Sequence, residues 1–306
     1  MGEDFLDKIL ELGLLAKGII PEEDDYEDHQ VYEEPKETKP QKTVEGYLYW
    51  RAPSAEYIRD LLETLHVLND EVFFTADANQ IKTQLMDPSH ISLIDLTIGS
   101  YAFEEYEIEG EKLEFGLDLK RLLKILPKKL KKHSMAFGYP ADEESDKAKI
   151  TIIDPTGSTQ EFYIDTLEVL ESSTYTPKFA ITAKARLNIH TLYQIIRQAE
   201  KIGEGEWTTV YVTIAISQDA VKISSKADSV EMTKTIDRYD PSLYELEADS
   251  EAHAKFSAER LSKFLAKARK LTDEVLVELS TNKPIRLTLP TQSGELQYLQ
   301  APVVDQ

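Results

Sequence analysis

The sequence predicts an α+β fold built from two similar domains. Each half of the chain after residue 46 opens with a strand, continues with an amphipathic helix and alternating strands, and closes with a second helix. The first helices are expected to begin after Ser54 and Asn188, and the second helices to span 117–126 and 257–271. The two helix starts lie 63 residues apart in the first half and 69 in the second, which indicates a duplicated unit.

Composition limits the possible functions. The chain has 306 residues, no cysteine and a formal net charge of −21. Without cysteine, disulfides, thiolate zinc sites and thiol catalysis are excluded. No apolar run reaches membrane-spanning length and no basic stretch precedes an apolar one at the N-terminus, so we expect a soluble protein with no secretory signal and no membrane partner. A uniformly acidic surface would repel nucleic acid, so DNA binding requires basic residues gathered on one face.

Residues 1–45 differ from the rest of the chain. Apolar residues at helical spacing predict a short amphipathic helix within residues 1–20. Residues 21–45 are acidic, contain three prolines and are predicted to form a disordered linker. Three interpretations of this extension stay open, namely a passive tail, a segment that recruits partners, and a segment that docks on the protein itself.

The remaining elements follow in order. Ser54 is a suitable N-cap for the first helix, and Asn188 precedes its counterpart. Alternating patterns predict strands in 72–85 and 209–225. Residues 164–178 lack a clear period and are predicted to connect the two domains. The predicted organisation is therefore an extension (1–45), a first domain (46–163), a connector (164–178) and a second domain (179–306).

Basic residues recur at spacings of three and four on three of the four predicted helices, so on each helix they share a face away from the apolar stripe. Pro127 is expected to end or kink the helix from 117, and lysines continue the basic run up to Lys132. No aromatic residues interleave with these stripes, which suits contact with phosphates rather than base readout. The predicted DNA-facing residues are Lys120, Arg121, Lys124, Lys128, Arg197, Lys201, Arg260, Lys263, Lys267 and Lys270.

The helix after Ser54 is the exception. Arg59 stands there among Glu56, Asp60 and Glu63, so a DNA contact by this helix is in doubt.

Catalytic patterns are absent from the sequence. The six histidines form no metal-binding spacing, and the glycines form no nucleotide-binding loop, so no cofactor and no metal are expected. The acidic pairs Glu104–Glu105 and Asp142–Glu144 are most simply solvated loop charges. A metal-dependent nuclease that uses these acidic clusters is the alternative from a different class.

Several ordered motifs resemble those of the proliferating cell nuclear antigen (PCNA) family of sliding clamps. Residues 85–96 read Leu-Met-Asp-Pro-Ser-His-Ile-Ser-Leu-Ile-Asp-Leu and are similar to the signature segment of that family. Residues 100–108, 117–126, 278–284 and 301–302 are also similar to clamp sequences. The resemblance spans roughly residues 46 to 304, so the extension lies outside it.

The resemblance implies the DNA clamp fold, in which three two-domain subunits form a ring with sheets outside and helices lining the channel. The ring would encircle duplex DNA, without catalysis, as the processivity factor of a DNA polymerase. Implied partners are a DNA polymerase, a flap endonuclease, a DNA ligase and a clamp loader. A homotrimer and a heterotrimer both stay open, as does a specialised repair or checkpoint clamp. The implied compartment is the cytoplasm in an archaeon or the nucleus in a eukaryote. The edge strands that join subunits would be about 111–116 and 229–236.

The resemblance also implies an apolar pocket for partner peptides that carry a Gln and aromatic anchors. Gln300 departs from the apolar residue common in the family, so the rim of the pocket is expected to differ. The residues that correspond to the pocket are Met86, His90, Ile91, Leu167, Val169, Pro284, Tyr298, Leu299, Ala301 and Pro302.

Overall fold

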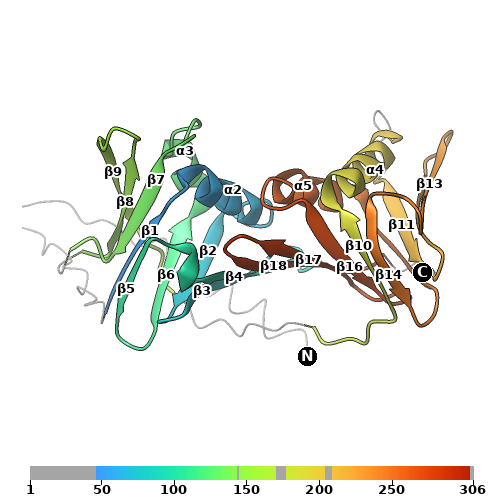
Figure 1. The fold of residues 1–306 in the computed structure, drawn as a ribbon, viewed down its shortest axis with the longest axis horizontal. Helices are drawn as coiled ribbons and strands as arrows, with labels where there is room; N and C mark the ends of the chain where they lie inside the picture. Colours follow the sequence, from blue (N-terminus) through green and yellow to red (C-terminus); the bar gives the residue numbers. More distant parts are fainter. Residues whose placement is uncertain (1–45, 143–144, 170–176, 204–208, 304–306) are drawn as a thin grey trace, which may run out of the picture. The chain divides into compact units, whose positions relative to one another are not determined.

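The computed structural model describes residues 46–142, 145–169, 177–203 and 209–303, so the predictions for residues 1–45 lie outside the described part of the chain. These residues contain 18 strands, four α-helices and one 3₁₀ turn (Figure 1). The first half comprises β1 (Tyr47–Ala52), α2 (Ala55–Leu65), β2 (Glu71–Ala76), β3 (Gln80–Met86), β4 (Ser92–Gly99), η1 (Ser100–Ala102), β5 (Glu105–Glu109), β6 (Leu113–Asp118), α3 (Leu119–Ile125), β7 (Ser134–Tyr139), β8 (Lys147–Ile153) and β9 (Thr159–Asp165). The second half comprises β10 (Ala183–Asn188), α4 (Ile189–Lys201), β11 (Tyr211–Ile216), β12 (Ala220–Lys226), β13 (Glu231–Asp237), β14 (Leu243–Ala248), β15 (Ala252–Ser257), α5 (Ala258–Ala268), β16 (Glu274–Leu279), β17 (Ile285–Thr291) and β18 (Gly294–Gln300). No helix in these ranges is long and apolar enough to span a membrane.

The two halves repeat the same element order and the same strand pairings, which confirms the predicted α+β duplication. In the first half β1 pairs with β5 and β7, and in the second half its counterpart β10 pairs with β14 and β16. Likewise β3 pairs with β4, and β12 pairs with β13. The strands β9 and β4 of the first half therefore correspond to β18 and β13 of the second.

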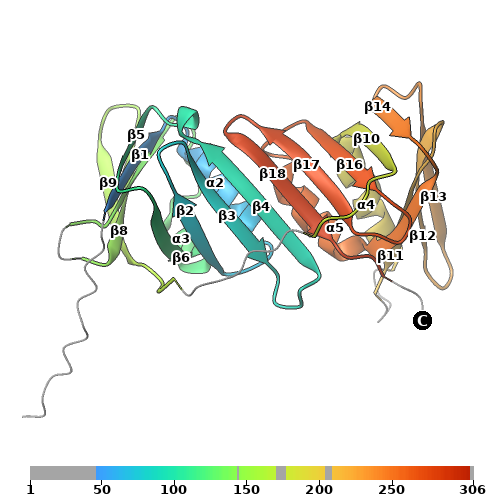
Figure 2. The same ribbon diagram turned by 90° about the horizontal axis from the view of Figure 1, so that it is seen from below.

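One nine-stranded sheet joins the halves, in the order β14-β10-β16-β17-β18-β4-β3-β2-β6. Its junction is the antiparallel pair β18–β4 (Figure 2). In this pair Leu296 lies opposite Leu96 and Tyr298 opposite Ile94. A five-stranded sheet, β5-β1-β7-β8-β9, and a four-stranded sheet, β13-β12-β11-β15, complete the architecture. The four helices lie on one side of the nine-stranded sheet (Figure 1), which we call the helix side, and the opposite side is called the outer face.

Local sequence explains where the helices begin. The side chains of Ser54, Asn188 and Ser257 each accept a hydrogen bond from a backbone amide of the first turn. The apolar stripe of each helix packs against the sheets, and the ring of Phe264 on α5 stacks on Tyr298 of β18 with 4.1 Å between centroids. The predicted helices after Ser54 and Asn188 and from 257 are confirmed.

The helix α3 is shorter than predicted. Leu117 still belongs to β6, where it pairs with Val72, and Asp118 caps the helix by accepting from the amide of Arg121 at 2.8 Å. The helix ends at Ile125, before Pro127, as the sequence predicted. Lys128 therefore lies beyond the helix, and the expectation that it shares a helical face with Arg121 and Lys124 is wrong.

One of the two predicted edge strands is an open edge. Within the described ranges β13 pairs only with β12, so 229–236 forms an open edge as predicted, and its role in joining subunits stays a prediction. The strand β6 is also terminal in its sheet, but Leu167 pairs with Gly116 along it, so the region 111–116 is partly covered. The strand β9 forms an open edge of the five-stranded sheet instead.

Candidate functional site

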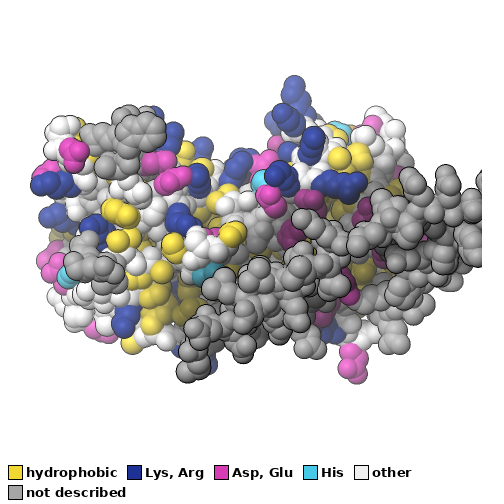
Figure 3. Space-filling model, turned by 180° about the vertical axis from the view of Figure 1, so that it is seen from behind, with side chains coloured by type: hydrophobic (Ala, Val, Ile, Leu, Met, Phe, Trp, Pro, Cys, Tyr) yellow, Lys and Arg dark blue, Asp and Glu magenta, His cyan; other side chains and the backbone are white. Residues whose placement is uncertain are grey.

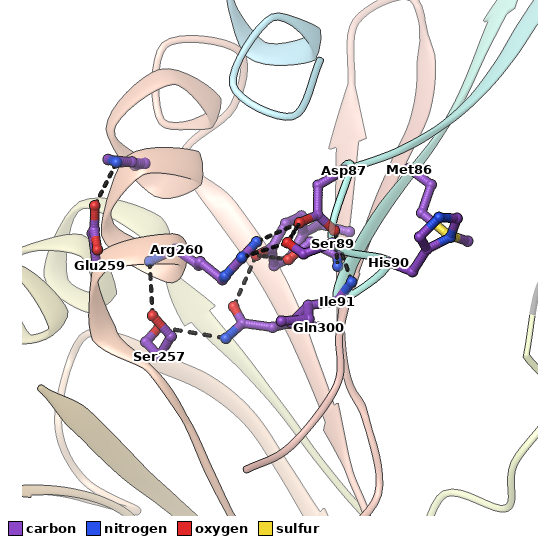
Figure 4. A network of polar contacts seen from close by, with 12 residues as sticks. Met86, Asp87, Ser89, His90, Ile91, Ser257, Glu259, Arg260 and Gln300 are labelled. Atoms are coloured by element: carbon purple, nitrogen blue, oxygen red, sulfur yellow. Dashed lines mark hydrogen bonds and ion pairs between the residues drawn. The ribbon is translucent and has the colours of Figure 1, made fainter. Parts of the chain in front are cut away.

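The turn between β3 and β4 is organised by the carboxylate of Asp87 (Figure 4). One oxygen, Oδ1, accepts from the backbone amides of Ile91 at 2.8 Å and Ser92 at 2.6 Å. The other, Oδ2, accepts from the hydroxyl of Ser89 and from the guanidinium of Arg260 at 2.6 Å. The side chain of Asp87 is only 7% exposed, so these bonds replace nearly all of its contact with water.

These bonds determine the charge of Asp87. Burial alone would favour the neutral acid, but the hydrogen bonds from Ser89, Ser92, Arg260 and Ile91 outweigh it and lower the pKa to about 2. Asp87 is therefore ionised at neutral pH, and its charge is matched by Arg260 from α5. The turn of the first half is thus fastened to a helix of the second half.

A second set of polar contacts continues from this turn into β18. The hydroxyl of Ser92 lies 3.2 Å from that of Tyr298, which donates to Oε1 of Gln300 at 2.8 Å. The amide of Gln300 donates to the carbonyl of Ser257, the N-cap of α5, at 3.4 Å. Gln300 is 1% exposed, so the expectation that it alters the rim of a pocket is wrong. Burial also raises the pKa of the Tyr298 hydroxyl, so this group stays neutral.

Strand geometry separates Tyr298 from Leu299. Successive side chains of a strand point to opposite faces of a sheet. Tyr298 stacks on Phe264 on the helix side, so Leu299 points to the outer face. The prediction grouped both residues in one pocket, and the structure places only Leu299 on the outer face.

An apolar patch lies on the outer face beside the turn. The register places Met86 opposite Leu93 and Leu93 opposite Leu299, in one row across three strands. In the next row the amide of Ala301 donates to the carbonyl of Ile91 at 2.9 Å. Leu93 and Leu299 are buried, whereas Met86 and Ile91 are exposed. We define the outer patch as Met86, His90, Ile91, Leu93, Leu299 and Ala301.

His90 completes the outer patch. It adopts a left-handed backbone conformation, with φ of 56°, that closes the turn. Its Nδ1 lies 3.0 Å from the sulfur of Met86 (Figure 4). Pro284 and Pro302, both half-buried, flank strands β17 and β18 at the end where Ala301 lies.

The structure does not bring Leu167 to the outer patch. Its amide donates to the carbonyl of Gly116 on β6 at 2.9 Å, and a Cβ added at Gly116 would approach the Cβ of Leu167 to 2.8 Å. Strand β2 lies between β6 and β3, so Leu167 stands about 14 Å across the sheet from the strand of Met86. Val169 is half-buried, and residues 170–176 that follow it lie outside the described residues.

On the helix side, the predicted basic stripe of α5 is paired with carboxylates. Lys267 contacts Glu63 of α2 at 2.9 Å, and Lys270 contacts Asp60 at 2.7 Å and Glu63 at 3.3 Å. Lys263 contacts Glu259 within α5 at 2.5 Å. Arg260 is held by Asp87, as described above. The stripe is therefore not a free positive face.

Residues of α2 that the prediction set aside supply much of this neutralisation. The side chains of Asp60 and Glu63 are 17% and 18% exposed. Burial alone would raise the pKa of Glu63, but the contacts with Lys267 and Lys270 lower it. Burial alone would lower the pKa of Lys270, but the contacts with Asp60 and Glu63 raise it. Arg59 bonds to Glu63 at 3.2 Å and to the carbonyl of Leu126 at 3.0 Å. Acidic residues at helical spacing on α2 were the sequence signal for this contact.

The other predicted DNA-facing residues divide into two groups. Lys120 contacts Asp70 at 3.3 Å, Arg121 contacts Asp165 at 3.7 Å and Arg197 contacts Glu200 at 2.8 Å. Lys124, Lys128 and Lys201 have no carboxylate of the described residues within 4.0 Å.

The acidic pairs proposed for the nuclease alternative do not assemble a recognisable site. Arg51 contacts Glu104 at 3.4 Å and Glu105 at 3.3 Å. Asp142 is described, but residues 143–144 are not. Across residues 46–142, 145–169, 177–203 and 209–303, no group of three or more His, Asp or Glu side chains is placed to hold a metal ion.

Comparison with known proteins gives a consistent result. Residues 50–171 match the family model of the N-terminal domain of proliferating cell nuclear antigen. The chain is 29% identical over 248 residues to DNA polymerase sliding clamp 1 of Pyrobaculum aerophilum, an alignment that covers 80% of this chain and 94% of the relative. It is 25% identical to the DNA polymerase sliding clamp of Cenarchaeum symbiosum, covering 83% and 97% of the two chains. The fold resembles a crystal structure of PCNA from Thermococcus kodakaraensis with a TM-score of 0.75 at 20% identity, covering 84% of this chain and all of that one.

Proposed function

We infer that this chain is a member of the PCNA family and a DNA polymerase sliding clamp. As a subunit of a three-membered ring it would encircle duplex DNA and tether replication and repair enzymes to it. It would act as a processivity factor, without catalysis of its own. The single observation that carries this proposal is the internal repeat, because the repeat supplies a rule for joining one subunit to the next.

The junction inside the chain predicts the junction between chains. Within the chain, β18 of the second half pairs with β4 of the first. Their counterparts are β9 and β13, and both are open edges in the described residues. Pairing β9 of one subunit with β13 of the next repeats the internal junction and covers two edges that would otherwise be free to aggregate. Such a head-to-tail contact closes into a ring when the rotation is suitable.

Repeating this junction also continues the helix layer. The helices lie on the same side of the sheet on both sides of the β18–β4 pair (Figure 1). A ring made by repeating the pair places all helices on one surface and the outer patch on the other. We assign the helix surface to the DNA channel and the outer patch to partner peptides.

The ring is tested first by molar mass in solution. A homotrimer is expected to have three times the mass of the 34.8 kDa chain, and a heterotrimer is expected to form only with related subunits. With a clamp loader and a polymerase on a primed template, the ring should increase the length of DNA that the polymerase synthesises each time it binds the template. A chain that stays single at every concentration, with and without related subunits, would contradict the proposal.

The β9–β13 junction is tested with two edge variants. Phe162→Glu in β9 and Met232→Glu in β13 each place a charge where a half-buried apolar side chain borders an open edge. Each variant alone is expected to lose the ring. Mixed together, they should form a two-chain species, because each still offers one intact edge. A mixture that remains single-chain while both variants are folded would place the junction elsewhere.

A further inference from the structure

We propose that the turn between α3 and β7 contacts the DNA backbone and holds the duplex more strongly than the basic stripe of α5 does. The lysine turn is defined as Lys128, Lys129, Lys131 and Lys132. This inference rests on the proposed function, because it assigns a contact within the proposed channel. It departs from the sequence prediction, which placed four of the ten DNA-facing residues on α5.

The lysine turn is held in place by its backbone and by one buried side chain. Leu130 is 1% exposed and anchors the turn in the core. The amide of His133 donates to the carbonyl of Leu130 at 3.0 Å, and the carbonyl of His133 accepts from Ala55, the first residue of α2, at 2.8 Å. Lys132 takes a left-handed conformation with φ of 64°, which turns the chain back toward β7. The four lysines are therefore presented from a fixed loop.

The charges of the lysine turn are available to a ligand. All four side chains are exposed, and no carboxylate of the described residues lies within 4.0 Å of their ammonium groups. On α5, in contrast, Lys267 and Lys270 already contact Glu63 and Asp60. A DNA phosphate could contact these two lysines only by displacing the carboxylates or by binding beside them. Lysines with no carboxylate partner among the described residues contribute to phosphate binding without that loss.

The position of the turn fits a channel contact. It follows α3 directly, and the guanidinium of Arg59 on α2 donates to the carbonyls of Leu126 at 3.0 Å and Pro127 at 3.2 Å. The turn therefore borders the helix side. In Figure 3, Lys and Arg side chains gather along the upper edge of the molecule, the edge along which the helices lie in Figure 1.

The chemistry suits a sequence-independent contact. An ammonium group is a compact point charge that binds a phosphate without a defined geometry, so four lysines on one turn can follow the backbone as the ring moves. Each phosphate neutralised releases counterions, and four contacts would add about 3.6 to the slope of log affinity against log salt.

The test compares three variants of the assembled ring with the wild type. The first replaces the four lysines of the turn by Gln. The matched control replaces four other exposed lysines that also lack a described carboxylate partner, which are Lys82, Lys178, Lys222 and Lys283. The third is the pair Lys267→Gln on α5 and Lys270→Gln just after it, called the α5 pair. Binding of a short blunt-ended duplex is measured between 50 and 200 mM salt.

The wild-type ring is expected to lose on the order of 100-fold more affinity over this salt range than the lysine-turn variant. The control should behave like the wild type, and the α5 pair should change the slope by less than half as much as the lysine-turn variant does, because two charges are removed instead of four. A lysine-turn variant with the slope of the control, or an α5 pair with the larger effect per lysine, would overturn the inference. A wild-type ring that binds no duplex and is not loaded would instead overturn the proposed function.

Discussion

Asp87→Asn is expected to lower the free energy of unfolding by about 2–3 kcal/mol. The asparagine keeps the size of the side chain but removes the charge that holds Arg260 at 2.6 Å. One of its two polar atoms also becomes a donor facing the donors Ser89 and Arg260. Denaturant unfolding of the ring and of a single-chain edge variant separates the loss within the chain from any loss of assembly.

Asp95→Asn is the matched control for this substitution. Asp95 lies on β4 near the same turn, but among the described residues it accepts only from the side-chain amide of Gln84, at 3.2 Å. Its replacement should change the free energy of unfolding by less than about 0.5 kcal/mol. If both substitutions have the same small effect, Asp87 does not organise the turn.

The contribution of Asp87 should also depend on pH. Its pKa is lowered from 3.8 to about 2, so its stabilisation is fully present above the unfolded value. Stability from this group is then lost as the pH falls from about 4 to about 2, and amounts to about 2 kcal/mol in total. Asp87→Asn should lack this part of the acid dependence. An unchanged acid profile in that variant would show that other carboxylates cause it.

The elements of the fold could be predicted because their signals are local. Apolar residues at helical spacing on 58–68, together with a capping side chain at Ser54, are sufficient to place α2. The end of β6 could not be placed in the same way. Leu117 fits a helix by sequence, and only its pairing with Val72 keeps it in the strand.

The functional surfaces were predicted less completely because they depend on contacts between distant segments. Strand alternation in 298–300 was sufficient to place Tyr298 and Leu299 on opposite faces, and the prediction did not use it. Leu167 lies beside β6 because of a backbone pairing 51 positions from Gly116, which no local pattern reveals. The neutralisation of Lys267 by Glu63 spans 204 positions, so it appears only once α2 and α5 are packed together.

Ile91→Glu is expected to weaken the binding of a partner peptide by about 30- to 100-fold, which is about 2–3 kcal/mol. The side chain is 39% exposed in the outer patch, whereas its backbone is fixed by Asp87 and Ala301. A carboxylate there should leave the fold intact, because it can reach solvent in the free protein. In the complex, an apolar anchor of the peptide would cover the charge without pairing it. The measurement is a titration with a synthetic peptide that carries a Gln and two aromatic anchors.

Ile125→Glu is the matched control for Ile91. It changes the same residue type at the same exposure, 38%, but at the end of α3 on the helix side. The control should bind the peptide within about twofold of the wild type, since its charge lies on the opposite side of the sheet. Because Ile91 and Ile125 differ mainly in the side of the molecule on which they lie, the pair tests the outer face itself. Equal weakening in both variants would indicate a general loss of structure, and full binding by Ile91→Glu would place the peptide away from the outer patch.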